Sequence, residues 1–459
     1  MTLIKSISGI RGTIGGFPGN NLTPLDIVKF SSAYGVWLKR KKGSGKLKIV
    51  LGRDARISGE MTDQLVTASL RGLGIDIVQT GLVSTPTVEM AVRNHSADGG
   101  IILTSSHNPA NWNALKLLNG SGEFISARDG EDVLQISENE DFEFSDVYNL
   151  GKIYFDNEAG DRHIRSILDL NLVDRKLIAR ADFTIAVDGI NSVGGIIIPE
   201  LLKQLGVRKI IRLNCEPDGN FRHTAEPLPE NLTGLSEMVF REKADLGFAV
   251  DPDVDRLVIV NEDGSMFGEE YTLVAVADYI LKHKPGNTVS NLSSTRALKD
   301  ITEKHGMNYF PAAVGEVNVV EKMKKVNAVI GGEGNGGIIY PELHYGRDAL
   351  VGVALFLSHL SQTGIKCSEL RKSYPDYSIS KHKTVIKNEI DFKETMSRIR
   401  KQYGSFSINE EDGLRIDFPD GWVHLRKSNT EPIVRVIAES TTKEKAVRLA
   451  TDILNLLEE

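Results

Sequence analysis

The sequence predicts three related α/β domains followed by a smaller α+β domain. Three successive segments share one plan, in which a strand, a helix and a strand precede a final strand that ends in a polar loop. Short runs rich in Val and Ile that alternate with helical stretches favour parallel or mixed sheets covered by helices. From about residue 370 the pattern changes to alternating apolar residues broken by Asp-Gly pairs, which is typical of antiparallel hairpins. With 459 residues the chain is too long for one ordinary core, and we expect domains at residues 1–152, 153–256, 257–369 and 370–459.

The first segment is expected to present a hydroxyl group at the end of a buried strand. Thr23 followed by Pro24 is typical of a helix start. The expected elements are a helix at residues 24–42, strands at 47–51, 75–79 and 99–104, and a helix that ends near residue 73. The last strand leads into residues 104–109, Thr-Ser-Ser-His-Asn-Pro, and open α/β sheets bind ligands beyond the carboxyl ends of their strands. Ser106 is therefore a candidate functional group. The alternatives are an ordinary turn hydroxyl and a hydrolase nucleophile, although no Gly-x-Ser-x-Gly motif surrounds it.

The second segment ends in alternating carboxylates. Its expected elements are strands at residues 184–187, 209–213 and 246–250 and a helix that ends near residue 205. Asp251, Asp253 and Asp255 follow the last strand, and an extended backbone would place their carboxylates on one side. Close carboxylates repel one another unless a cation lies among them, and hard oxygen ligands suit Mg²⁺. A calcium EF-hand is disfavoured because Arg256 occupies the glycine position and strands flank the loop. A solvated acidic turn is the other alternative.

Two later loops carry groups suited to binding, one of them sugar hydroxyls and the other an anion. Strands at residues 288–292, 308–311 and 328–330 and a helix at 296–305 are expected in the third segment. It ends in residues 331–337, Gly-Gly-Glu-Gly-Asn-Gly-Gly, where Glu333 and Asn335 offer acceptors to sugar hydroxyls. No Lys-Ser/Thr pair follows, so this is not a Walker loop. Residues 426–432, Arg-Lys-Ser-Asn-Thr-Glu-Pro, together with Arg435 suit an anion, the alternative being an ordinary basic turn.

Composition narrows the classes of partner. A formal net charge of −7 gives no general attraction to nucleic acid or to an anionic membrane, so an anionic ligand needs a local cationic cluster. The only cysteines, Cys215 and Cys367, lie far apart in the sequence, which favours a reducing compartment. The first residues lack the apolar core of a signal peptide, and residues 349–357 are too short for a membrane span and predict a buried helix. We therefore expect a cytoplasmic protein.

The four loops together resemble the α-D-phosphohexomutase superfamily across essentially the whole chain. The chain matches four family patterns. Residues 104–109 match Thr-x-Ser-His-Asn-Pro, and residues 251–256 match Asp-x-Asp-x-Asp-Arg. Residues 332–336 match Gly-Glu-x-Ser/Asn-Gly, and residues 426–432 match Arg-x-Ser-Asn-Thr-Glu-Pro. Smaller matches lie at residues 8–12, 52–54 and 84–86. The resemblance implies three α/β domains and a smaller C-terminal domain around a central cleft.

The resemblance also implies a reaction, a cofactor and residue roles. The enzyme would move a phosphoryl group between the 6- and 1-positions of a hexose phosphate through phosphorylated Ser106 and a hexose 1,6-bisphosphate. Implied ligands of Mg²⁺ are Ser106, through its phosphate, Asp251, Asp253 and Asp255. Implied catalytic residues are Ser106, His107, Lys116, Arg11 and Arg256. Implied substrate-binding residues are Glu333, Asn335, Arg426, Ser428, Asn429, Thr430 and Arg435. The implied partner is a small-molecule sugar phosphate, bound by a monomer or homodimer.

The chain departs from the family pattern at two places. Gly337 stands where some members have histidine, which leaves Lys116 and Arg11 as candidate general base and acid, with His344 as a substitute. Ala114 replaces a common glycine. The form of residues 332–337 resembles members that act on glucosamine phosphate, so glucosamine 6-phosphate is the expected substrate, with mannose and glucose phosphates as the alternative. Two other classes stay open, a non-catalytic sugar-phosphate-binding protein and a phosphatase.

Overall fold

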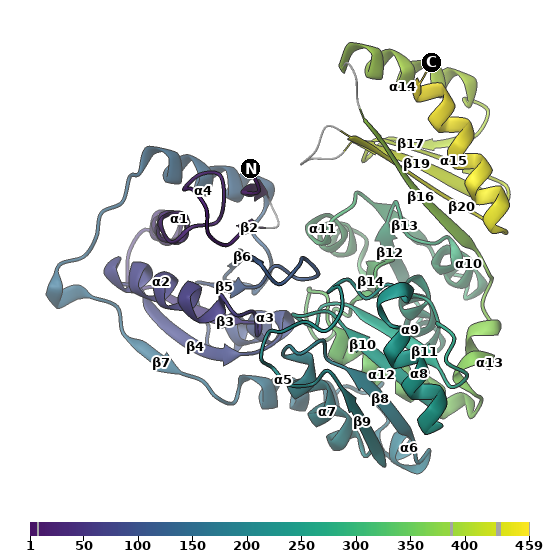
Figure 1. Ribbon diagram of the computed structural model, residues 1–459, viewed down its shortest axis with the longest axis horizontal. Coiled ribbons are helices and arrows are strands. Elements are labelled where there is room, and N and C mark those ends of the chain that lie inside the picture. Colours follow the sequence, from purple (N-terminus) through teal and green to yellow (C-terminus); the bar gives the residue numbers. More distant parts are fainter. Residues whose placement is uncertain (7–8, 386–388, 428–432, 459) are drawn as a thin grey trace. The chain divides into compact units, whose positions relative to one another are not determined.

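The computed structural model describes residues 1–6, 9–385, 389–427 and 433–458 (Figure 1). The described chain forms two compact units, Met1–Thr272 with Gly336–Ser368 and Leu273–Asn335 with Glu369–Glu459. In the described part of the chain, no helix combines the length and the apolar character that crossing a bilayer requires.

The first sheet of the first unit is mixed. Its strand order is β1-β2-β6-β5-β3-β4-β7, and β3 pairs in parallel with β4 and β5, whereas β6 pairs antiparallel with β2 and β5. The strands are β1 Ile4–Ser6, β2 Gly9–Thr13, β3 Lys48–Arg53, β4 Asp76–Leu82, β5 Gly99–Leu103, β6 Trp112–Asn119 and β7 Ile153–Phe155. The helices are α1 Pro24–Lys42, α2 Gly59–Gly72, α3 Thr85–Asn94, α4 Ala127–Asn139 and α5 Ala159–Leu168 (Figure 1).

Alternating strand residues bury both faces of this sheet. Successive side chains of a strand point to opposite faces. Ile49 and Leu51 of β3 therefore pack with apolar residues of α1, α2 and α4, whereas Val50 between them packs with residues of α3. Both faces of β3 and β5 are thus covered, and the carboxyl ends of these strands open into the polar loops that carry the candidate site.

The second sheet of the first unit has the order β11-β10-β8-β9. Its elements are β8 Thr184–Asp188, β9 Lys209–Leu213, β10 Leu246–Val250, β11 Leu257–Asn261, α6 Arg175–Arg180, α7 Gly194–Leu205 and α8 Thr233–Glu242. The same unit contains β15 Gly337–Ile339 and α12 Ala349–Thr363. Phe356 of α12 makes edge-to-face contacts with Phe248 of β10 and with Phe267, at centroid distances of 6.3 and 5.2 Å. The apolar stretch at 349–357 is therefore a buried helix, as its sequence predicts.

The second unit contains the central strands of the third segment and the C-terminal sheet. β12 Asn287–Asn291 lies between β13 Tyr309–Ala312 and β14 Ala328–Glu333 and is parallel to both. Its helices are α10 Ala297–Lys304 and α11 Glu316–Val326, and α9 Glu269–His283 and α13 Cys367–Lys372 run across the unit boundaries. The antiparallel C-terminal sheet has the order β16-β20-β19-β18-β17. Its elements are β16 Ser378–Val385, α14 Glu389–Gln402, β17 Ser407–Asn409, β18 Leu414–Phe418, β19 Gly421–Lys427, β20 Ile433–Ser440 and α15 Lys443–Glu458.

The expected strands and helices are present, but β3, β14, β15 and β19 extend into residues that the sequence assigned to loops. β3 includes Gly52 and Arg53, which pair with Ile102 and Leu103 of β5. β14 similarly continues through residues 331–333, so that only 334–336 connect it to β15. The glycines there continue the backbone hydrogen bonding of the ladder, and the flexible glycine-rich loop is shorter than its composition suggests.

Candidate active site

Ser106 lies in a strained turn just beyond the carboxyl end of β5. Its φ is +46°, in the left-handed region that residues other than glycine adopt uncommonly. Its backbone N–H donates to Thr104 Oγ1 at 3.0 Å, and its Oγ donates to Asp251 Oδ2 at 2.6 Å. Such a conformation costs on the order of 1–3 kcal/mol and often marks a functional position. The turn directs the hydroxyl group to the carboxylate loop of the second sheet.

The carboxylates of Asp251, Asp253 and Asp255 converge, although the backbone between them is not extended. All three side chains are fully buried, and their ligand oxygens lie within 4.8 Å of one another. The expectation of an extended segment is wrong, because Val254 has a φ of +62° and its N–H donates to the Asp251 carbonyl at 3.1 Å. A tight turn after β10 therefore gathers the carboxylates. Asp251 Oδ1 closes this turn by accepting from the backbone N–H of Asp255 at 3.1 Å.

The charges at this turn are only partly balanced. Burial, and then Asp255 and Asp253, raise the pKa of Asp251 well above its usual value. Burial would also raise the pKa of Asp253, but Lys116 and the hydrogen bonds with Thr85 and Asp251 together outweigh burial, and the pKa falls. Lys116 Nζ lies 2.6 Å from Asp253 Oδ2 and 3.6 Å from Asp255 Oδ2. Burial tends to lower the pKa of Lys116, yet the two carboxylates raise it overall, so the side chain is a cation.

The donor atoms fit a magnesium ion. Within the described part of the chain, Asp253 Oδ1 and Asp255 Oδ1 are buried and have no hydrogen-bond partner. Buried polar atoms are nearly always hydrogen-bonded, so oxygens without such partners require an explanation. Crowded carboxylate oxygens are the ligands that Mg²⁺ prefers, and a divalent cation would relieve the repulsion that raises the pKa of Asp251.

Two arginines face the same carboxylate. Arg256 Nε lies 3.9 Å from Asp255 Oδ1, and Arg347 Nη2 donates to Asp255 Oδ2 at 2.6 Å. No sequence motif indicated Arg347, which precedes α12 and lies far along the chain from its partner. Burial, and then Arg256 and Arg347, lower the pKa of His107 to about 2, so this imidazole is neutral. His107 therefore adds no positive charge beside Ser106.

The remaining predicted residues of this unit have defined places. Arg11 lies in β2 opposite Ala114 of β6, and β6 is continuous through this alanine. His344 is buried, with Nδ1 3.2 Å from Glu89 Oε2 and Nε2 3.2 Å from Asp348 Oδ2. Burial opposes its protonation, but Asp348 and Glu89 outweigh burial and raise the pKa of His344 to about 9. His344 is thus held as a cation between carboxylates, an arrangement that suits an ion pair better than a general base.

The second unit holds the predicted sugar and phosphate residues. Glu333 Oε1 accepts from Asn291 Nδ2 at 2.8 Å and from the backbone N–H of Gly315 at 3.2 Å, while Asn335 is half-buried. Ser428, Asn429 and Thr430 lie outside the described residues.

A row of cations crosses the C-terminal sheet. Arg426 of β19 pairs with Arg435 of β20, which pairs with Lys383 of β16. Like charges directly opposite one another destabilise a sheet, and Asp412 Oδ2 lies 3.5 Å from Arg426 Nη1. The row is a suitable surface for an anion. Lys383 has no place in the sequence motif, and only the strand register reveals it.

Comparisons with known proteins agree with this architecture. The models of phosphoglucomutase/phosphomannomutase domains I and II match residues 3–144 and 161–264. The models of domains III and IV match residues 268–377 and 379–456. Each matched range contains one of the four loops. The domain boundaries at residues 152, 256 and 369 stay predictions.

Relatives span the whole chain. A phosphoglucomutase/phosphomannomutase of Thermococcus kodakarensis is 34% identical over 98% of both chains. A probable phosphoglucosamine mutase of Methanopyrus kandleri is 32% identical over 98% of this chain and 96% of its own. The solved structure of a phosphoglucomutase/phosphomannomutase family protein from Burkholderia thailandensis superposes with a TM-score of 0.85 and 26% identity, covering 99% of this chain and 98% of the other.

Each of the three α/β domains and the smaller C-terminal domain is thus matched by its own domain model. The relatives match this chain over nearly its whole length. The chain therefore belongs to the phosphoglucomutase/phosphomannomutase family of the α-D-phosphohexomutase superfamily and is a phosphohexomutase, an isomerase that acts as an intramolecular phosphotransferase.

Proposed function

We propose that this enzyme interconverts 6-phospho and 1-phospho hexoses through phosphorylated Ser106. The observation that carries the proposal is the Ser106 hydroxyl group, which lies 2.6 Å from Asp251 Oδ2 within a buried set of carboxylates. Lys116 and Arg347 supply positive charge to the same set. Phosphoryl transfer depends on positioning and on neutralising charge on the moving group, which is the chemistry that this arrangement offers.

In the proposed reaction, phosphorylated Ser106 loses its phosphoryl group to a sugar hydroxyl. The bond between phosphorus and Ser106 Oγ breaks and that oxygen takes a proton from a general acid, while a bond to the sugar oxygen forms and the hydroxyl proton passes to a general base. Lys116 and Arg11 stay the predicted candidates for this base and acid, and Lys116, which is a cation here, can act as a base only after giving its own proton to the departing Ser106 Oγ. The hexose 1,6-bisphosphate then returns its other phosphoryl group to Ser106. Asp251, Asp253 and Asp255, with an oxygen on phosphorylated Ser106, would hold Mg²⁺, which when bound neutralises charge on the phosphoryl oxygens.

The substrate contacts belong to the same proposal. Glu333 and Asn335 would accept hydrogen bonds from sugar hydroxyls, and Arg426, Arg435 and residues 428–430 would bind the phosphate that is not reacting. Arg256 would neutralise charge on the moving group. Binding energy at the non-reacting phosphate helps to align the other end of the sugar. We also keep the predictions of a cytoplasmic location and of a monomer or homodimer.

We favour glucosamine 6-phosphate as the substrate, with mannose and glucose phosphates as the alternative. The preference rests on the form of residues 332–337, and the relatives bear names of both kinds. The test is kcat/KM on glucosamine, glucose and mannose phosphates under one set of conditions. The glucosamine value should be the highest, and a value far below the other two would reject the preference without affecting the mutase proposal.

The same assays separate the mutase from the two other classes. A phosphatase would release inorganic phosphate at the rate at which substrate disappears, and a non-catalytic binding protein would bind sugar phosphate without turnover. We expect isomer formation to exceed phosphate release at every substrate concentration. Equal rates of the two would support the phosphatase instead.

Replacing Arg426 with alanine should weaken transition-state binding. Loss of one member of a charge pair with the phosphate is expected to cost ~2–4 kcal/mol, which corresponds to roughly a 30- to 1,000-fold loss in kcat/KM. The matched control is Arg400→Ala, because Arg400 pairs with Glu410 on the surface of the same domain at 2.6 and 2.7 Å. The control should stay within about twofold of wild type, since exposed pairs contribute little. An unchanged kcat/KM in the Arg426 variant would remove this arginine from the site.

A further inference from the structure

One buried guanidinium group holds the backbone of the serine loop. Arg56, which follows β3, is 1% exposed. Its Nη1 donates to the carbonyl oxygens of Pro109 and Trp112 at 2.6 and 3.0 Å. Its Nη2 donates to those of Ser106 and Asn108 at 2.5 and 2.8 Å. The donors of this side chain are therefore directed at peptide groups from both ends of the loop.

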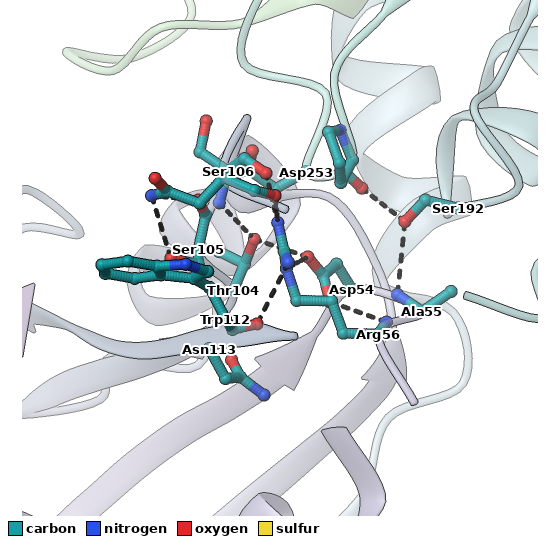
Figure 2. Close-up of polar contacts among 12 residues, drawn as sticks. Asp54, Ala55, Arg56, Thr104, Ser105, Ser106, Trp112, Asn113, Ser192 and Asp253 are labelled. Atoms are coloured by element: carbon teal, nitrogen blue, oxygen red, sulfur yellow. Dashed lines mark hydrogen bonds and ion pairs between the residues drawn. The ribbon is translucent and has the colours of Figure 1, made fainter. Parts of the chain in front are cut away.

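Asp54 connects this clamp to the other side of Ser106. Its Oδ2 accepts from Arg56 Nε at 3.0 Å and from Thr104 Oγ1 at 2.6 Å. Thr104 Oγ1 in turn accepts the backbone N–H of Ser106 at 3.0 Å. Figure 2 shows Asp54 beside the Thr104–Ser106 loop, with dashed lines to Thr104 and Arg56. Both peptide groups of Ser106 are thus fixed, the carbonyl by Arg56 and the N–H by Thr104.

The residue between Asp54 and Arg56 contacts the carboxylate loop as well. The backbone N–H of Ala55 donates to Ser192 Oγ at 3.3 Å (Figure 2). Ser192 Oγ in turn donates to the carbonyl of Pro252 at 2.7 Å. Pro252 lies between Asp251 and Asp253. Residues 54–56 therefore hold the serine loop and, through Ser192, the loop that carries the carboxylates.

We propose that Arg56 is a positioning residue for the phosphoryl-transfer reaction. Its side chain fixes the Ser106 backbone in the left-handed conformation that directs Oγ toward Asp251. The guanidinium group donates to loop carbonyls and to Asp54, so it acts through Ser106 and not on the substrate. The inference rests on the proposed phosphoserine mechanism. It predicts that loss of Arg56 lowers the rate of transfer much more than it lowers substrate binding.

The test compares Arg56→Ala and Arg56→Lys with the control Arg71→Ala. Arg71 also fastens a backbone carbonyl of the first domain, since its Nε donates to Gly151 at 3.0 Å, but it lies at the end of α2. Each variant is assayed for kcat and KM well below its own Tm, with and without methylguanidinium. We expect Arg56→Ala to lose on the order of 100-fold in kcat, with KM within about threefold of wild type. Methylguanidinium should raise the kcat of Arg56→Ala at least about tenfold, because it can occupy the space that the side chain leaves.

The lysine variant and a double variant complete the design. Arg56→Lys should be intermediate, because lysine keeps the charge but has no planar fork of donors. If Arg56→Ala does not fold, Asp54→Asn with Arg56→Met removes both charges of the buried pair and is assayed in its place, with the same low kcat and near-normal KM expected.

Several outcomes would overturn the inference. One is a folded Arg56→Ala or double variant with wild-type kcat. Another is an equal loss of kcat in the Ala and Lys variants without any response to methylguanidinium, because that result would mean that Arg56 only stabilises the fold. A different result would contradict the proposed function, namely a wild-type enzyme that neither carries phosphate on Ser106 nor forms the isomer.

Discussion

Replacement of Ser106 with alanine should abolish mutase activity and leave the fold intact. The change removes the oxygen that we propose receives the phosphoryl group, and removal of a nucleophile costs on the order of 10⁶-fold in kcat in a serine enzyme. The only hydrogen bond lost from the described contacts of this side chain is the one to Asp251. Isomer formation, thermal unfolding and intact mass of the purified protein would be measured together. Wild type should carry about 80 Da of added mass at Ser106, and the variant should carry none.

Ser105 offers a matched control for this experiment. It is a buried serine of the same loop, and its Oγ accepts from Asn108 Nδ2 at 3.1 Å. Ser105→Ala should therefore perturb the loop slightly and keep activity within about tenfold, since a typical hydrogen bond contributes about 1 kcal/mol. An active Ser106→Ala enzyme, prepared free of wild-type protein, would contradict the phosphoserine mechanism.

Asp251→Asn should strongly lower activity while raising the Tm of the metal-free protein. Burial and the neighbouring carboxylates raise the pKa of Asp251, so its charge destabilises the folded state at neutral pH when no cation is present. Asparagine keeps the shape and removes that charge, but it is a poorer ligand for Mg²⁺. We expect at least about a 100-fold loss of activity, because metal-bound charge stabilisation is worth several kcal/mol.

The measurement combines thermal unfolding in EDTA with activity as a function of added Mg²⁺. Chelation should inactivate wild type, and Mg²⁺ should restore it. Asp263→Asn is the control, because Asp263 lies in an exposed turn after β11 and its Oδ1 accepts from the backbone of Ser265 at 2.9 Å. A fully active Asp251→Asn enzyme, or a wild type that is indifferent to chelation, would exclude this carboxylate from a metal site.

Local patterns were sufficient to predict most of the fold. The pair Thr23-Pro24 predicted the start of α1, and Asp420-Gly421 predicted the hairpin of β18 and β19. These signals act within a few residues, where backbone geometry and hydrogen bonding decide the structure. The three carboxylates were also found from spacing alone, although the backbone geometry assumed for them was wrong. Left-handed Val254 could not be foreseen, because the packing of a tight turn and not its own propensity sets its conformation.

Residues that act through distant partners could not be found in this way. Arg347 and Asp255 lie 92 positions apart, and Arg56 lies 50 positions from the Ser106 carbonyl that it binds. Nothing in the sequence near either arginine indicates a partner, and each could have been a surface residue. The motifs identified the groups proposed to react, whereas the structure was needed to find those that hold them in place. The roles of Glu333, Asn335 and the phosphate loop stay predictions.

The left-handed backbone at position 106 limits which amino acid can serve there. Threonine carries the same hydroxyl group, but its branched Cβ crowds the backbone at positive φ, where such residues are genuine outliers. The chemistry of the hydroxyl would permit either residue, and the shape of the turn does not. The proposed Arg56 clamp would thus also select the smaller of the two alcohols as the proposed phosphoryl carrier.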